Sequence, residues 1–100
     1  MDALSTDDTG AICQKYNVRF FEKEWINYSV NKNYANDLTK NDWILSVDAD
    51  EVLSDELIES LKNLNPENDK VYLLDRISNF CGQWVRHGGW YPDWKIRLFN

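Results

Sequence analysis

The chain has 100 residues, of which 43% are hydrophobic and 28% charged, as in globular proteins and unlike disordered or fibrous ones. Its net charge is −6: the first 69 residues carry 15 acidic and 6 basic side chains, whereas the last 31 carry two acidic and five basic ones. The acidic bulk excludes nucleic acid as the expected partner, because nucleic-acid binding needs a basic face. The basic, aromatic last third could contact an anionic substrate or the surface of an acidic membrane, although most of these charges are better interpreted as ordinary solvated surface groups.

No apolar run approaches the roughly 20 residues of a membrane-spanning helix. The start at Met1 has neither the positive flank nor the apolar stretch of a signal peptide. Cys13 and Cys81 lack metal-ligand spacing, so we interpret both as reduced thiols. We therefore expect a cytoplasmic protein, with the inner face of the plasma membrane as one option for its location.

The predicted elements alternate between helix and strand. Residues 5–9 are rich in helix-capping side chains, and a helix through residues 11–16 follows them. Residues 18–21 form a short β-rich run. Apolar positions recur every four residues between 29 and 38, which predicts a second helix.

Residues 43–47 give the clearest strand, because they are nearly all apolar, as in a central strand buried on both faces. A third helix, capped by Ser54 or Asp55, should run to residue 64, followed by strands at 71–74 and 95–99. This alternation predicts an α/β layer with parallel strands. Since the order begins with a helix and ends with a strand, we expect a fragment of a longer domain.

The strand at 43–47 leads directly into Asp48-Ala49-Asp50-Glu51. Ligands of open α/β sheets bind at the carboxyl ends of strands, and residues two apart can direct both carboxylates to one side. Such a pair attracts a divalent cation, which can neutralise a departing diphosphate. From the spacing alone, a polar loop that begins the next helix is an equally good interpretation.

The string from Asp42 to Glu51 resembles the metal-binding segment of family 2 glycosyltransferases, which have the GT-A fold. The run from Asp2 to Thr9 is similar to that family's nucleotide-binding turn, usually Asp-Ser-Gly-Ser-Thr-Asp. Asn31-Lys32-Asn33 resembles its Gln-Lys-Asn stretch. Residues 86–93 resemble a block of the branch that contains bacterial lipopolysaccharide-core glucosyltransferases. These four segments follow the family's order over nearly the whole chain.

The resemblance implies a Rossmann-like GT-A nucleotide-diphospho-sugar transferase fold, with an incomplete sheet and helices on its faces. It implies metal-dependent, inverting transfer of a sugar from a nucleotide-diphosphate donor. Among such donors, a UDP-sugar is the preferred expectation. The acceptor would be a cell-surface glycan or a lipid-linked molecule, as in bacterial lipopolysaccharide or polysaccharide biosynthesis. The implied cofactor is Mg²⁺ or Mn²⁺.

The resemblance also implies roles for individual residues. Asp2, Lys32 and Asp48 would bind the donor nucleotide, and Asp50, assisted by Asp48, would hold the metal ion. The predicted catalytic base is Asp93, with His87 as the second choice, although both can also be ordinary loop residues. Stacking against the acceptor sugar is predicted for an aromatic set that could instead complete the core: Trp84, Trp90, Tyr91 and Trp94.

The chain departs from the family pattern at Ala3-Leu4, where Ser-Gly is usual, so the backbone would approach the nucleotide less closely. We expect residues 1–100 to be a single glycosyltransferase domain fragment that lacks the first strand and helix and the C-terminal part. Such a fragment could be inactive by itself. The alternative function is a non-catalytic carbohydrate-binding or interaction module with the same fold. A nucleotidyltransferase is disfavoured, because no glycine-rich basic phosphate loop lies near the start.

Overall fold

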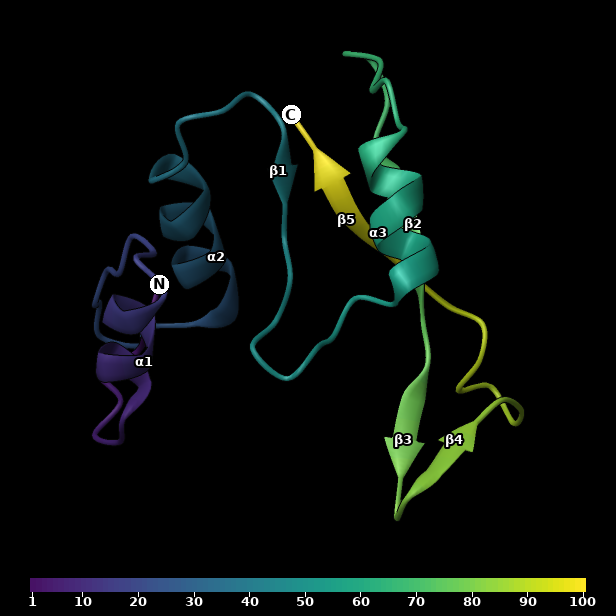
Figure 1. The fold of residues 1–100 in the computed structure, drawn as a ribbon, viewed down its shortest axis with the longest axis horizontal. Coiled ribbons are helices and arrows are strands. Elements are labelled where there is room, and N and C mark those ends of the chain that lie inside the picture. Colours follow the sequence, from purple (N-terminus) through teal and green to yellow (C-terminus); the bar gives the residue numbers. More distant parts are fainter. The chain divides into compact units, whose positions relative to one another are not determined.

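The computed structural model describes all 100 residues, which form two compact units, Met1–Lys40 (unit 1) and Asn41–Asn100 (unit 2) (Figure 1). Unit 1 contains the helices α1 (Thr9–Lys15) and α2 (Tyr28–Asp37). Unit 2 contains α3 (Asp55–Lys62) and all five strands. The three predicted helices are thus confirmed. None of them is both long and apolar enough to cross a bilayer.

The most deeply buried side chain of unit 1 is Asn31 of α2, which is 1% exposed. Its amide oxygen accepts a hydrogen bond from the Ile26 N–H at 3.1 Å, and its amide nitrogen donates to the Glu24 carbonyl at 3.3 Å. Asn27 caps the helix by accepting from the Val30 N–H at 2.9 Å. Because an unpaired buried polar group costs about 1–3 kcal/mol, these bonds fix the segment before α2 to the helix.

The β-rich run at 18–21 does not form the predicted strand. Its neighbour Glu22 instead makes a single parallel bridge with Asp2. The Asp2 N–H donates to the Phe21 carbonyl at 2.7 Å, and the Lys23 N–H donates to the Asp2 carbonyl at 2.9 Å. No further bridge continues the pairing on either side, so no ladder forms. The bridge holds the backbone of Asp2 beside the segment that follows α1.

The sheet of unit 2 has the order β1 (Ile44–Leu45), β5 (Asp93–Phe99), β2 (Tyr72–Arg76). Residues 43–47 are therefore not a central buried strand: β1 is short, half-buried and at the edge, because β5 is its only partner. The prediction of parallel neighbours is also wrong, since both hydrogen-bonded pairs are antiparallel. It follows that β1 and β2 run in the same direction, with the antiparallel β5 between them.

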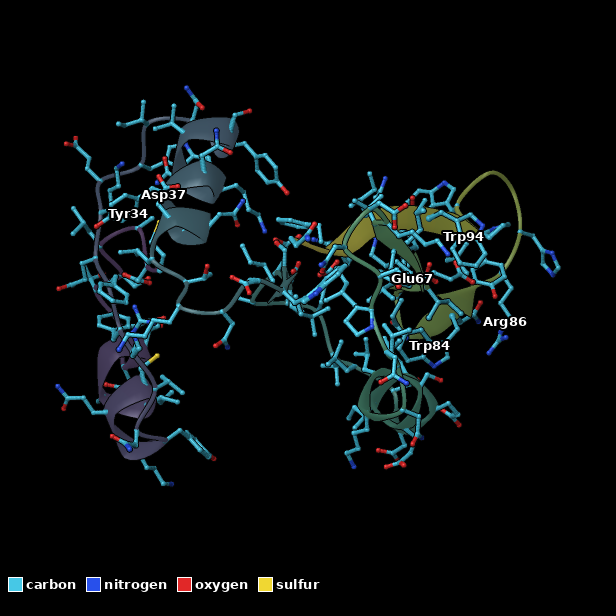
Figure 2. The ribbon with its side chains drawn as sticks, turned by 90° about the horizontal axis from the view of Figure 1, so that it is seen from above. Tyr34, Asp37, Glu67, Trp84, Arg86 and Trp94 are labelled. Atoms are coloured by element: carbon cyan, nitrogen blue, oxygen red, sulfur yellow. The ribbon has the colours of Figure 1, made fainter.

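Helix α3 connects β1 to β2 and lies to one side of the sheet, as the two perpendicular views show (Figures 1 and 2). It is capped as predicted, with the Ser54 hydroxyl accepting from the Leu57 N–H at 3.2 Å. The core of unit 2 is small: Leu98 of β5 is 8% exposed, and the rings of Trp43 and Tyr72 meet edge to face at 5.8 Å.

Strands β3 (Ser78–Phe80) and β4 (Gln83–Val85) form a separate two-stranded antiparallel hairpin. In Figure 1 the hairpin extends away from the three-stranded sheet of unit 2. Its two turn residues have positive φ angles, +50° at Cys81 and +81° at Gly82, as the tightest hairpin turns require. The Asn79 side chain closes the turn by accepting from the Gly82 N–H at 3.0 Å.

Leu4 has a φ of +64°, in the left-handed region that disfavours any residue with a Cβ atom. It occupies the position where the similar family turn has glycine. Its side chain is 52% exposed, so packing offsets little of the backbone strain.

Replacing Leu4 with Gly should raise the free energy of unfolding by up to about 1 kcal/mol. Removal of Cβ relieves roughly 1–2 kcal/mol of strain, and the added freedom of the unfolded chain offsets part of that gain. Thermal unfolding followed by circular dichroism measures the change. Leu4→Ala, which keeps Cβ, is the control and should give no stabilisation. Equal stabilisation by both variants would trace the effect to the exposed leucine side chain and not to the backbone.

Candidate functional site

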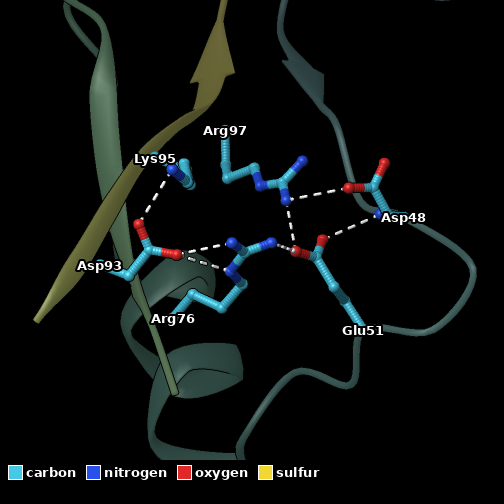
Figure 3. Close-up of polar contacts among 6 residues, drawn as sticks. All are labelled: Asp48, Glu51, Arg76, Asp93, Lys95 and Arg97. Carbon is cyan, nitrogen blue, oxygen red and sulfur yellow. Dashed lines mark hydrogen bonds and ion pairs between the residues drawn. The ribbon is translucent and has the colours of Figure 1, made fainter. Parts of the chain in front are cut away.

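Six charged side chains of unit 2 form one continuous network of ion pairs (Figure 3). Acidic and basic groups alternate along it, so their charges balance and each carboxylate lies beside at least one cation. The members, in order of contact, are Asp48, Arg97, Glu51, Arg76, Asp93 and Lys95.

Glu51 is the central acid of this network and is only 18% exposed. Its Oε1 pairs with Arg97 and lies 3.5 Å from Nη1 of Arg76. Its Oε2 accepts from the Asp48 N–H at 2.9 Å, while the Glu51 N–H donates to the Asp48 carbonyl at 3.0 Å. The acidic turn is therefore closed twice, once by backbone and once by side chain, and is tied to two arginines.

Arg97 connects this turn to the sheet. Its side chain is 11% exposed, and its Nη2 donates both to Oδ2 of Asp48 at 3.1 Å and to Oε1 of Glu51. Arg97 lies on β5, and its carbonyl accepts from the Ser46 N–H at 2.8 Å. One residue of the central strand thus holds both the end of β1 and the two carboxylates that follow it.

Asp93 occupies the other end of the network, directly opposite Arg76 in the β2–β5 pairing. Its Oδ2 accepts from Nε and Nη2 of Arg76 at 2.9 and 2.6 Å, and its Oδ1 lies 2.9 Å from Nζ of Lys95. The bonds from Lys95 and Arg76 hold the pKa of the Asp93 carboxyl below its usual value. Asp93 is therefore an ionised carboxylate engaged by two cations.

Asp50 differs from its neighbours in the acidic turn, because its side chain is exposed and makes no hydrogen bond or ion pair. No three His, Cys, Asp or Glu side chains come together in a group that could hold a metal ion. A Mg²⁺ ion, however, is commonly bound by one or two carboxylates together with substrate phosphates and water. A free Asp50 carboxylate close in sequence to Asp48 fits that all-oxygen ligand set.

The predicted donor-binding residues Asp2 and Lys32 belong to unit 1, whereas Asp48 and Asp50 belong to unit 2. The Asp2 carboxylate accepts from the hydroxyl and the N–H of Ser5, both at 2.7 Å, and these bonds lower its pKa. Nζ of Lys32 lies 5.6 Å from the ring centroid of Tyr28. Asp2 is thus a preformed acceptor in a turn, and Lys32 is a cation on the surface of α2.

The three tryptophans predicted to bind the acceptor, Trp84, Trp90 and Trp94, are 60%, 55% and 56% exposed. Figure 2 labels Trp84 and Trp94 among the side chains of unit 2. The alternative that these tryptophans complete the core is therefore wrong. Tyr91 is half-buried, and its hydrogen bond with Asp75 raises the pKa of its hydroxyl.

His87, the second candidate for the base, is exposed in the loop between β4 and β5. It belongs to none of the ion pairs around Asp93. The structure therefore brings Asp48 and Asp93 into one network and leaves His87 outside it.

Sequence reasoning missed the two arginines of the network, Arg76 and Arg97, and the anchoring role of Glu51. A signal was present in the last strand, where Asp93, Lys95 and Arg97 alternate at every second position. Side chains at that spacing share one face of a strand, so opposite charges there indicate a row of ion pairs. The sequence pattern does not predict that Glu51 pairs with this row, because Glu51 is 46 residues from Arg97.

Residues 1–99 match the family model described as Glycosyl transferase family 2. The chain belongs to glycosyltransferase family 2. An uncharacterized glycosyltransferase of Rickettsia conorii is 44% identical over 78 residues, which are 77% of this chain and 28% of that protein. The lipopolysaccharide core biosynthesis glycosyltransferase LpsC of Rhizobium meliloti is 33% identical over 76 residues, which are 71% of this chain and 28% of that protein.

The resemblance seen in the four sequence motifs is thereby confirmed, and the match runs through both units. The chain aligns with less than a third of the length of these relatives. No solved structure matches it significantly. The structure itself is a mixed α/β arrangement of three helices and two small sheets.

Replacing Arg97 with Gln should lower the free energy of unfolding by about 1.5–3 kcal/mol. The change leaves two carboxylates facing each other without their shared cation, and hydrogen bonds to charged groups contribute in this range. Urea unfolding of the 100-residue chain measures the loss. Lys62→Gln is the matched control, because its pair with Glu59 is 64% and 65% exposed and should contribute about 0.5 kcal/mol or less. Equal losses in the two variants would contradict an anchoring role for Arg97.

Proposed function

We propose that the whole protein transfers a sugar from a nucleotide-diphosphate donor, with UDP as the expected nucleotide, to a bacterial cell-surface glycan or lipid-linked acceptor. Membership of glycosyltransferase family 2 supports a nucleotide-sugar donor and an acceptor in general. The similarity to a lipopolysaccharide core biosynthesis glycosyltransferase supports the choice of acceptor.

The observation that carries this proposal is the free, exposed carboxylate of Asp50 on a turn whose other two acids are held by Arg97. Asp50, assisted by Asp48, would hold Mg²⁺ or Mn²⁺, which when bound neutralises the negative charge of the departing diphosphate. Glu51 and Arg97 keep the turn in place before the donor arrives. Groups that are already oriented need no rearrangement during the reaction. Such preorganised electrostatic stabilisation of the transition state is often the largest single contribution to the rate enhancement of an enzyme.

In unit 1, Asp2 and Lys32 are proposed to contact the nucleotide. The Asp2 carboxylate is held by Ser5 and remains an acceptor for an N–H group of the base. Lys32 offers a positive charge for a phosphate. Both assignments rest on the positions of these residues in the family's motifs.

Transfer with inversion is proposed as one displacement. The acceptor hydroxyl oxygen forms a bond to the anomeric carbon as the bond from that carbon to the diphosphate breaks, and the hydroxyl proton passes to a base. Asp93 is the proposed base, with its neighbours Tyr91 and Trp94 against the acceptor sugar. Arg76 holds Oδ2 of Asp93, so Oδ1 is the oxygen that would receive the proton. Oδ1 pairs with Lys95, which is 47% exposed, and the acceptor hydroxyl would replace Lys95 at this oxygen.

The metal assignment is tested by Mn²⁺ titration of the 100-residue chain, with and without UDP, followed by amide-resolved NMR. Paramagnetic broadening should centre on residues 48–51 and should increase with UDP. Asp50→Asn should weaken Mn²⁺ binding by at least roughly tenfold, since losing groups that merely orient a metal's ligands costs 10–100-fold. Asp69→Asn removes another exposed acid of unit 2 and should change nothing. Unchanged broadening in Asp50→Asn would rule out this residue as the ligand.

The role of Asp93 is tested by turnover of the whole protein. Asp93→Asn should lower kcat by roughly 10²–10⁴-fold without weakening donor binding, the range expected for loss of a general base. Arg76→Gln is the control, because it breaks the same ion pair but keeps the carboxylate. Since Arg76 lowers the pKa of Asp93, its removal should shift the acidic limb of kcat/KM to higher pH. If Arg76→Gln instead abolishes turnover as completely as Asp93→Asn, then Asp93 acts through the ion-pair network and is not the base.

A further inference from the structure

The tip of the β3–β4 hairpin (residues 80–84) exposes two large apolar side chains. Phe80 is 62% exposed and Trp84 is 60% exposed. The hairpin from Ser78 to Val85 contains no charged residue, and it extends away from the sheet of unit 2 (Figure 1). Among the large apolar side chains of unit 2, only Val52 is more exposed. Two such groups at one uncharged hairpin tip mark a candidate site of interaction.

The pairing register shows what kind of partner can cover this tip. Trp84 lies opposite Asn79, and Phe80 lies opposite Gln83. Because adjacent positions of a strand point to opposite faces, Phe80 and Trp84 project from opposite sides of the ribbon. A sugar or a protein groove that docks on one face would cover only one of them. A surrounding medium covers both, as the interfacial region of a lipid bilayer does.

The charges around the tip favour an anionic surface. No Asp or Glu occurs from residue 76 to residue 92, although the whole chain has a net charge of −6. Arg86 is exposed and follows β4 directly, with the exposed His87 next to it. Carboxylates would be repelled by acidic headgroups, whereas each arginine near such a surface adds attraction. Tryptophan is itself enriched at the level of the headgroups.

The tip is also braced from the side. Trp90, in the loop after β4, meets the ring of Phe80 edge to face at 6.2 Å. Trp90 is 55% exposed and therefore enlarges the apolar surface on the Phe80 side. With the turn closed by Asn79, the hairpin presents these rings without having to fold on contact.

We propose that the hairpin tip inserts into the headgroup region of an anionic bilayer, with Phe80 and Trp84 buried among the lipids and Arg86 against their phosphates. Membrane binding by the hairpin does not involve the donor site. Its advantage rests on the function proposed above, because it would keep the protein at the surface where a lipid-linked acceptor resides.

The test is co-sedimentation of the 100-residue chain with vesicles of phosphatidylcholine that contain phosphatidylglycerol, compared with vesicles of phosphatidylcholine alone. The wild type should bind the anionic vesicles, and the double variant Phe80→Ala/Trp84→Ala should bind at least roughly tenfold more weakly, since membrane binding scales with buried apolar area. Trp25→Ala is the matched control: Trp25 is 56% exposed but lies in unit 1, and its loss should have no effect. Arg86→Gln should weaken binding to the anionic vesicles only.

A second readout avoids dependence on the folding of the double variant. Lipids with brominated acyl chains should quench the tryptophan emission of the wild type more than that of Trp84→Phe, while Trp25→Phe should be quenched at least as strongly as the wild type. Three results would overturn the proposal: no binding to anionic vesicles, an equal loss in Trp25→Ala, or self-association in sedimentation velocity that the hairpin variant abolishes. The last would assign the tip to a second copy of the chain.

Discussion

The arrangement of unit 2 depends on one guanidinium group. Arg97 comes from the central strand, is almost enclosed, and shares its Nη2 between the carboxylates of Asp48 and Glu51. Desolvating a charge is costly unless opposite charges and hydrogen bonds accompany it, so the position of Arg97 dictates where both acids must lie. The turn that carries Asp50 is therefore placed by the sheet through Arg97, in addition to the two hydrogen bonds that close it locally.

The same network explains how an acidic chain can gather three carboxylates in so small a space. Arg76, Lys95 and Arg97 match Asp48, Glu51 and Asp93 one for one. Repulsion among the acids is offset within the network by the three basic side chains. A metal ion at Asp50 would then respond to the charge brought by the donor, because the remaining acids are already neutralised.

Local features of the fold could be predicted from the sequence, whereas long-range pairing could not. The three helices were predicted from signals that lie within a few residues. The cap at Ser54 is confirmed by its bond to the Leu57 N–H, whereas Asp8 at the start of α1 makes no side-chain cap bond. The strand at 43–47 was predicted to be central because its residues are nearly all apolar. Apolar composition indicates burial, but it does not identify the neighbouring strands. β1 is an edge strand because β5 is its only partner, and no short-range pattern encodes the contact of Leu45 with Leu98.

The candidate site divides in the same way. The acidic turn and Asp50 were predicted from residues next to one another, within a chain that matches the family model. Asp93 was identified from its sequence block, but its two cations were not, because Arg76 lies 17 residues away on another strand. The strained Leu4 was visible only as a departure from the family's glycine, and its backbone angle came from the structure.

The position of β5 between β1 and β2 has a consequence for biosynthesis. Neither of those strands has any other hydrogen-bonded partner, so their edges stay open until residues 93–99 have been synthesised and have left the ribosome. Contacts between distant parts of a chain form slowly and leave unpaired strands exposed in the meantime. The contacts that define unit 1 lie within its own 40 residues and do not involve β5. In unit 2, the three-stranded sheet therefore cannot be completed during translation until β5 is available.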